Sequence, residues 1–273
     1  MRITPLSAPL GAIVHALDAT RRIPSETAGA LRKALDQHRL LLLKGSSVSP
    51  SELVAFASTF GTPAAHGIVA GLAGYDFITE IRKEPDHGHN YGGTWHTDLS
   101  HQASPPLATV LQAWELPTIG GDTLWSDQYR AYEGLPPELR KRVDTLSAEH
   151  SAQLAFGDLA HDAASSIHPL APVHPRTACR HLYVNPVSIV RLFDENGDEV
   201  HDGEALLADL LAHATQAKYQ YRHRWSEGDL LVWDNRSTLH MAINDYPGQR
   251  RVMRRVAVTA STGLPDEMSD RQP

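Results

Sequence analysis

Two residues with metal-binding side chains, His96 and Asp98, are separated by a single residue in the sequence. On an extended segment, residues two positions apart point to the same side, so both side chains can reach one ion. An imidazole and a carboxylate suit a divalent metal such as Fe(II) or Mn(II), and one further histidine would complete a facial triad. The triplet alone has little weight, because chance supplies it easily in a chain with 16 histidines.

His240 is the second candidate ligand, and it follows the apolar run 229–234, which is typical of a buried strand. We therefore expect His240 just beyond the end of a strand, where a sandwich of two sheets opens. If His240 is considered alone, the role of a partly buried, hydrogen-bonded histidine in a loop explains it better than the role of a metal ligand does.

Three arginines, Arg251, Arg254 and Arg255, lie in the run 251–260, which has the composition of a strand. Alternation along a strand places Arg251, Met253 and Arg255 on the same face. If that face is the inner one, both guanidinium groups are buried and require an anion. A guanidinium can hold a carboxylate through two parallel hydrogen bonds. The alternative is an exposed, charged edge strand, and the residues alone do not exclude it.

The elements that must position these side chains are mainly strands. Apolar periodicity and capping residues, with Ser25 and Ser49 as N-caps, predict helices at 24–38, 49–60, 129–144 and 203–217. Runs rich in Val, Leu and aromatic residues predict strands at 39–45, 77–81, 107–116, 181–186, 219–225, 229–234 and 251–260. Regular strand–helix alternation is missing, which argues against a doubly wound fold and favours a two-sheet jelly roll with helices outside it.

The composition limits the classes of partner. The net charge of −7 argues against a sequence-independent nucleic-acid binder, which needs clustered Lys and Arg. Cys179 is the single cysteine, so an intramolecular disulfide is impossible, as expected in a reducing compartment. We see neither a signal peptide nor a run of about 20 apolar residues that would cross a bilayer. The sequence thus predicts a soluble, cytoplasmic protein without a membrane or nucleic-acid partner.

Six separated blocks of the chain together resemble the taurine dioxygenase/2,4-dichlorophenoxyacetate dioxygenase (TauD/TfdA) family. The blocks read W-H-T-D, P-P, E-L-P-x-x-G-G-D-T-L-W, L-Y-V-N, W-D-N-R-x-T-x-H and Q-R-R-x-M-x-R. They occur in this order at 95–98, 105–106, 115–125, 182–185, 233–240 and 249–255. The resemblance extends from about Phe60 to Ala260, and the ordered set is far more specific than any one block.

The resemblance implies a single domain spanning 1–273, mainly β with flanking helices, built as a double-stranded β-helix (a cupin-like jelly roll). It implies that His96, Asp98 and His240 bind Fe(II). It further implies that 2-oxoglutarate and O2 are cosubstrates, that succinate and CO2 are released, and that the substrate is hydroxylated, with cleavage of a C–X bond as an open outcome.

Four further residues match family positions that bind anions. By position, Arg251 and Thr123 match residues that hold the distal carboxylate of 2-oxoglutarate. Arg255 and His66 match contacts that taurine dioxygenase makes to the anionic head of its primary substrate. The resemblance therefore predicts a small anionic substrate with a sulfonate, sulfate or carboxylate group.

The chain also departs from the family pattern. Glycines at 92 and 93 replace an acidic, amide-rich segment that helps taurine dioxygenase read the substrate amine, which points to a substrate other than taurine. The segment 145–180 is irregular, rich in His, Pro and Ala, and particular to this chain, and we expect it to form an active-site lid. Relatives commonly form dimers or tetramers, so a homo-oligomer is open.

Two other classes of protein fit parts of the pattern. Zinc also accepts two histidines and a carboxylate, so a zinc-dependent hydrolase is one alternative. A non-catalytic jelly-roll protein, whose buried arginines hold an anion, is the other. Neither alternative requires all six blocks.

Overall fold

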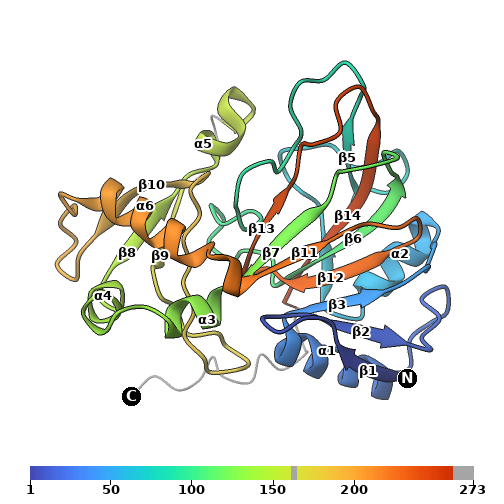
Figure 1. Ribbon diagram of the computed structural model, residues 1–273, viewed down its shortest axis with the longest axis horizontal. Helices are drawn as coiled ribbons and strands as arrows, with labels where there is room; N and C mark the ends of the chain where they lie inside the picture. Colours follow the sequence, from blue (N-terminus) through green and yellow to red (C-terminus); the bar gives the residue numbers. More distant parts are fainter. Residues whose placement is uncertain (161–164, 261–273) are drawn as a thin grey trace.

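Two sheets packed face to face form the centre of the protein (Figure 1), and the computed structural model describes residues 1–160 and 165–260. The larger sheet has eight strands in the order β1-β2-β3-β12-β6-β14-β4, and β5 also pairs with β14. The smaller has three, in the order β11-β7-β13. The larger consists of β1 (Arg2–Pro5), β2 (Ala12–His15), β3 (Leu40–Leu43), β4 (Thr62–Ala64), β5 (Thr79–Lys83), β6 (Ala108–Glu115), β12 (Leu230–Asp234) and β14 (Arg251–Thr259). The smaller consists of β7 (Thr123–Asp127), β11 (Gln220–His223) and β13 (Thr238–Ala242).

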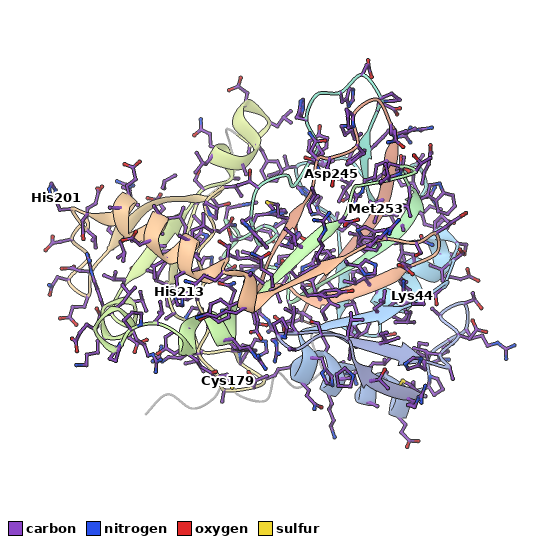
Figure 2. The ribbon with its side chains drawn as sticks, viewed as in Figure 1. Lys44, Cys179, His201, His213, Asp245 and Met253 are labelled. Atoms are coloured by element: carbon purple, nitrogen blue, oxygen red, sulfur yellow. The ribbon has the colours of Figure 1, made fainter. Side chains whose placement is uncertain are left out.

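Large apolar side chains fill the space between the two sheets. Trp125 of β7 packs against Trp233 of β12, with ring centroids 5.6 Å apart. Met253 of β14, labelled in Figure 2, belongs to the same buried cluster. Full burial of such side chains contributes about 1.5–3 kcal/mol each. Because Met253 faces this interior, Arg251 and Arg255 on the same side of β14 face it too, as the alternation predicted.

Two helices cover the outer face of the larger sheet. They are α1 (Ser25–His38) and α2 (Pro50–Ala57). Leu35 of α1 and Phe56 of α2 share one buried cluster with Val110 of β6 and Val256 of β14. This face is therefore a second apolar core, which holds β6 and β14 in place.

A smaller lobe lies beside the two sheets (Figure 1). A three-stranded sheet forms part of it, with β8 (Ser147–His150), β9 (Ser166–Pro169) and β10 (Ile189–Phe193) in the order β10-β8-β9. Its helices and 3-10 turns are α3 (Gln128–Glu133), α4 (Pro137–Val143), α5 (Ala152–Phe156), η1 (Gly157–Ala160), α6 (Gly203–Ala214) and η2 (Ala217–Tyr219). Leu182, Leu206 and Leu210 belong to its own buried cluster.

Three details of the predicted helices change. Ser25 is the first helical residue and not the N-cap, which is Pro24 with no side-chain hydrogen bond. The predicted helix 129–144 is divided into α3 and α4, because Pro136 and Pro137 cannot donate the amide bonds that would continue it. The predicted helix 203–217 ends at Ala214. Ser49 forms the expected N-cap of α2. None of the helices that the structure describes is long and apolar enough to span a membrane.

The predicted strand at 181–186 and the predicted irregular segment 145–180 are both wrong. Residues 181–186 belong to no sheet in the described chain, because Leu182 N donates to Gln128 O (3.2 Å) while Tyr183 N donates to Leu170 O (2.9 Å). These acceptors come from different segments, so no ladder forms. The segment 145–180 is not irregular throughout, since it contains β8, α5 and β9. Seven short strands were also not predicted: β1, β2, β4, β8, β9, β10 and β13.

Candidate active site

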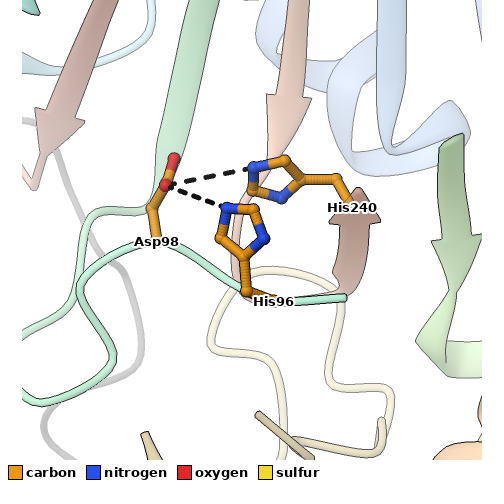
Figure 3. Close-up of side chains that lie close together, drawn as sticks. All are labelled: His96, Asp98 and His240. Carbon is orange, nitrogen blue, oxygen red and sulfur yellow. Dashed lines mark ion pairs between the residues drawn. The ribbon is translucent and has the colours of Figure 1, made fainter. Parts of the chain in front are cut away.

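The three predicted metal ligands converge at one point. Nε2 of His96 and Nε2 of His240 each lie 3.9 Å from Oδ1 of Asp98 (Figure 3). One ligand atom from each of the three residues lies within 4.8 Å of the others, so a single cation could contact all three. They are the only group of this kind among the described residues.

Backbone pairing places the two imidazoles side by side. His96 N donates to His240 O at 2.9 Å, and His240 N donates to His96 O at 2.8 Å. The two residues thus form an antiparallel bridge, and their ring centroids are 4.0 Å apart. His240 was expected just beyond a strand end and instead lies within β13. That position fixes its ring beside the ring of His96.

Asn235 holds the segment that carries Asp98, and it was not predicted as a site residue. Its side chain is fully buried. Asp98 N donates to Asn235 Oδ1 (2.8 Å), and Asn235 Nδ2 donates to Asp98 O (2.9 Å). Thr97, between the two ligands, turns away from them and donates its hydroxyl to Asn235 Oδ1 (3.1 Å). His96 and Asp98 consequently share the opposite side, as the spacing predicted.

The protonation states of the three groups suit a divalent cation. His96 Nδ1 donates to Thr94 O (2.7 Å), which leaves the lone pair of Nε2 free. Burial lowers the pKa of His96 and of His240, so both rings are neutral at pH 7. Burial alone would raise the pKa of Asp98, but the charge of Arg255 and the two histidines lower it below its usual range. Two neutral imidazoles and one carboxylate are a metal-binding donor set.

Arg255 and His66 lie at the same centre. Arg255 Nη1 donates to Asp98 Oδ1 (2.6 Å), and Thr109 Oγ1 donates to Asp98 Oδ2 (3.0 Å). Burial, followed by the charge of Arg255, lowers the pKa of His66 to about 4. Val69 N donates to Nδ1 of this neutral ring (3.2 Å), so Nε2 carries the proton. Arg255 and His66 therefore offer donors beside the metal centre.

Arg251 is a buried cation without a carboxylate partner. It is 4% exposed, and the described residues place no carboxylate in ion-pair contact with it. Its Nε donates to Gly121 O (3.1 Å) and its Nη2 to Thr123 Oγ1 (3.4 Å). Burial lowers its pKa. A buried guanidinium with so few partners is costly unless an anion joins it.

The turn at Gly121 makes this position of Arg251 possible. Gly121 has a φ of +72°, and a Cβ there would lie 3.1 Å from Arg251 Cδ. Its amide donates to Asp245 Oδ1 (2.7 Å), which holds the turn against the chain after β13. The sequence predicted a turn here but no contact with Arg251.

Trp225 is a further residue that the sequence did not indicate. Its Nε1 donates to Thr123 Oγ1 at 2.9 Å. Arg251 donates to the same oxygen, so the hydroxyl oxygen of Thr123 already accepts two hydrogen bonds. The proton of Thr123 is therefore directed to another acceptor. Together, Thr123 and Arg251 form a buried site for an anion.

Strand pairing relates the anion site to the metal centre. His240 of β13 pairs with Trp125 of β7, and Thr123 lies two residues before Trp125 on the same strand. On β14, Arg255 contacts Asp98, while Arg251 lies four residues earlier on the same side. The seven residues named from the sequence thus form two adjoining groups, with Arg251 and Thr123 in one and the other five around Asp98.

Comparisons with known proteins identify relatives of this chain. The family model "Taurine catabolism dioxygenase TauD, TfdA family" matches residues 2–257. Pentalenolactone F synthase of Streptomyces arenae is 33% identical, over 94% of this chain and 94% of its own. An alpha-ketoglutarate-dependent sulfate ester dioxygenase of Pseudomonas putida is 29% identical, over 94% and 88%.

A solved structure shows the same architecture. A taurine dioxygenase from Burkholderia xenovorans superposes with a TM-score of 0.82 and 31% identity, covering 95% of this chain and 91% of that one. The predicted jelly-roll fold and class of enzyme are thereby confirmed. The chain belongs to the taurine catabolism dioxygenase TauD, TfdA family.

Proposed function

We propose that this chain is an Fe(II)- and 2-oxoglutarate-dependent dioxygenase that hydroxylates a small anionic organic substrate. The observation that carries the proposal is a donor set at Asp98 that adjoins a buried cation, Arg251, with which no carboxylate of the described residues forms an ion pair. His96, Asp98 and His240 would hold the iron. Bound Fe(II), with 2-oxoglutarate and O2, supplies the oxidation of a C–H bond and releases succinate and CO2.

Arg251 and Thr123 would bind and orient 2-oxoglutarate. The guanidinium supplies charge and parallel donors, and the Thr123 proton supplies one more hydrogen bond. Trp225 positions that proton, because its Nε1 occupies an acceptor site of the Thr123 oxygen. The buried location excludes water from these hydrogen bonds and strengthens them.

Replacing Trp225 by Phe is expected to raise the KM for 2-oxoglutarate by about 3- to 10-fold, the worth of one neutral hydrogen bond. The Thr123 hydroxyl then loses its fixed orientation while the ring volume is largely retained. Initial rates against 2-oxoglutarate concentration measure the effect. Trp114→Phe is the control, since Trp114 is 45% exposed on the outside of β6. An unchanged KM in Trp225→Phe would contradict the positioning role.

His66 and Arg255 would bind the anionic head of the primary substrate. Arg255 uses one donor on Asp98, which leaves its other donors for the substrate. His66 adds the Nε2 proton. The substrates named for relatives, among them a sulfate ester, are anionic as well. We therefore propose a sulfate, sulfonate or carboxylate head and keep hydroxylation with C–X cleavage as an open outcome.

The segment 145–180 remains our proposed lid. Phe156 at the end of α5 packs edge-on against the ring of His66, with centroids 5.4 Å apart. A side chain from this segment thus covers His66, one of the two residues proposed to bind the head of the substrate. The cytoplasmic location and a homodimer or homotetramer remain predictions. The zinc-hydrolase and binding-protein alternatives find no support in the family match.

A panel of small anions, scored for coupled succinate release, tests the proposed function. With the most active anion of this panel, His66→Leu is expected to raise the KM for the anion about 10- to 100-fold, because a hydrogen bond to a charged group is lost. His66→Gln keeps a donor and is expected to retain most of the affinity. The KM for 2-oxoglutarate should change less than about twofold in both. Equal KM values for the anion in His66→Leu and wild type would exclude His66 from its binding.

A further inference from the structure

His101 is a buried polar residue near the metal centre that the proposed function leaves without a role. It follows Asp98 by three residues, and Leu99 between them has a φ of +52°. Gln102 N donates to Leu99 O (3.1 Å), so the chain turns directly after the ligand. His101 is only 6% exposed. The turn therefore keeps its ring inside the protein, close to the residues around Asp98.

Ring contacts connect His101 to the proposed substrate head. Phe156 packs edge-on against His101 with centroids 6.2 Å apart, and against His66 at 5.4 Å. The charge of His101 also contributes, after burial and Arg255, to lowering the pKa of His66. Phe156 consequently packs against both histidine rings and lies between these two parts of the proposed substrate site.

Several buried polar atoms in this region have no hydrogen-bond partner among the described residues. They include Nδ1 of His101, Nε2 of His150 and Oη of Tyr183, whose ring centroid lies 5.3 Å from that of His150. His150 is fully buried, and His101 is close enough to influence its pKa. Buried polar atoms are nearly always paired, and an unpaired one indicates a missing water or ligand. Unpaired nitrogens on His101 and on His150, which contacts the neighbouring Ser100 (2.9 Å), point to a polar group of the substrate.

The tautomer of His150 follows from its neighbours. Asn185 Nδ2 donates to Ser100 Oγ (2.7 Å), and Ser100 Oγ lies 2.9 Å from His150 Nδ1. The buried Ser100 hydroxyl has no acceptor other than His150 Nδ1 among the described residues, so it donates its proton to Nδ1, and Nε2 of His150 carries the ring proton. The unpartnered Nε2 is thus a hydrogen-bond donor.

Neither of these two rings is charged at pH 7. Burial lowers the pKa of His101, and burial with the charges of His168 and His101 lowers that of His150 to about 3. The described residues place no carboxylate in ion-pair contact with either ring. A substrate amine would find no counter-charge here. An uncharged substrate oxygen, in contrast, can accept a hydrogen bond from Nε2 of His150 and form a second hydrogen bond with Nδ1 of His101.

We propose that His101 and His150 form a neutral polar subsite that binds a hydroxyl, carbonyl or ether oxygen on the body of the anionic substrate. The inference rests on the proposed function, since the head of that substrate is taken to bind His66 and Arg255. It makes His101 a residue that determines specificity for substrates with an uncharged oxygen over purely hydrocarbon ones.

Matched pairs of anions test the subsite. We would compare ω-hydroxyalkyl sulfates with alkyl sulfates of equal heavy-atom number, for chains of three to six carbons, and the corresponding carboxylates. Binding to enzyme loaded with Fe(II) and 2-oxoglutarate is measured by calorimetry without oxygen, and succinate release is measured with it. In wild type, at least one hydroxyl member is expected to bind about 10-fold more tightly than its methyl partner.

Variants separate the subsite from general effects. His101→Phe is expected to reduce the hydroxyl-to-methyl ratio to about 1, with an unchanged KM for 2-oxoglutarate. His213→Phe is the control, because His213 lies on α6 in the smaller lobe (Figure 2) and is expected to keep the wild-type ratio. A ratio of 1 or below for every pair in wild type would overturn the proposal without any variant. So would an unchanged ratio in His101→Phe.

The same data distinguish this inference from the proposed function. Succinate release with hydrocarbon anions, but no preference for oxygen, rejects the subsite and leaves the dioxygenase assignment intact. Absence of binding and of succinate release in both series rejects both. A crystal structure of the complex adds a direct check. A water that stays between His101 Nδ1 and His150 Nε2, with the substrate oxygen elsewhere, would show a structural role for the pair.

Discussion

Replacing His96 by Ala is expected to reduce 2-oxoglutarate turnover by more than about 100-fold. Loss of a residue that only supports a metal ligand already costs about 10- to 100-fold, and His96 is proposed to be a ligand itself. The ring supplies a neutral Nε2, and no other His, Cys, Asp or Glu of the described residues belongs to this donor set. Coupled succinate release with saturating Fe(II), together with iron content after desalting, measures the loss.

The fold should survive this substitution. His96 has no strong ion pair, and its backbone bridge to His240 does not depend on the side chain. Asp98→Ala is expected to lose activity equally but also to destabilise the protein, because it leaves Arg255 buried without its carboxylate. Comparing the two variants by thermal unfolding separates metal binding from folding.

His201→Ala is the matched control, since His201 is exposed in the smaller lobe, at the edge of the molecule (Figure 2). It is expected to match wild type in activity and iron content. Near-normal turnover in His96→Ala, with iron supplied, would remove the metal assignment altogether.

Replacing Arg251 by Ala is expected to raise the KM for 2-oxoglutarate about 100-fold, because a buried hydrogen-bonded charge pair is worth about 2–5 kcal/mol when one partner is truncated. Arg251→Lys should give an intermediate value, since lysine keeps the charge but not the two parallel donors. Rates at varied 2-oxoglutarate and anaerobic binding titrations measure both.

Thermal unfolding gives a second, independent measure of the same role. A buried cation without a counter-ion disfavours the folded state, so Arg251→Ala without 2-oxoglutarate should unfold at the wild-type temperature or above it. Adding 2-oxoglutarate should raise the unfolding temperature of wild type but not of the variant. A marked destabilisation of the ligand-free variant would indicate a structural arginine.

Arg250→Ala provides the control for Arg251. Its side chain is 38% exposed and pairs with Glu84 and Glu115 on the surface. Exposed pairs of this kind contribute about 0–1 kcal/mol. The KM for 2-oxoglutarate should therefore be unchanged. An equal rise in both variants would show that the effect comes from β14 as a whole.

Local geometry is what the sequence by itself determined. The spacing of His96 and Asp98 and the alternation of Arg251, Met253 and Arg255 depend only on the two-residue period of an extended chain. Both relationships hold in the structure, because no distant segment is needed to satisfy them. The order of the six blocks also predicted the family, which the comparisons confirm.

Contacts between distant segments were decided only by the tertiary structure. Asn235 is 137 positions from Asp98, and Trp225 is 102 positions from Thr123. The contact of His150 with Ser100, 50 positions away, is of the same kind. Whether such side chains meet depends on sheet register and on how the lobe packs, and neither leaves a periodic signal in the chain. The alternation could therefore place Arg251 on the inner face, but only the packed sheets showed that no carboxylate of residues 1–160 and 165–260 pairs with it there.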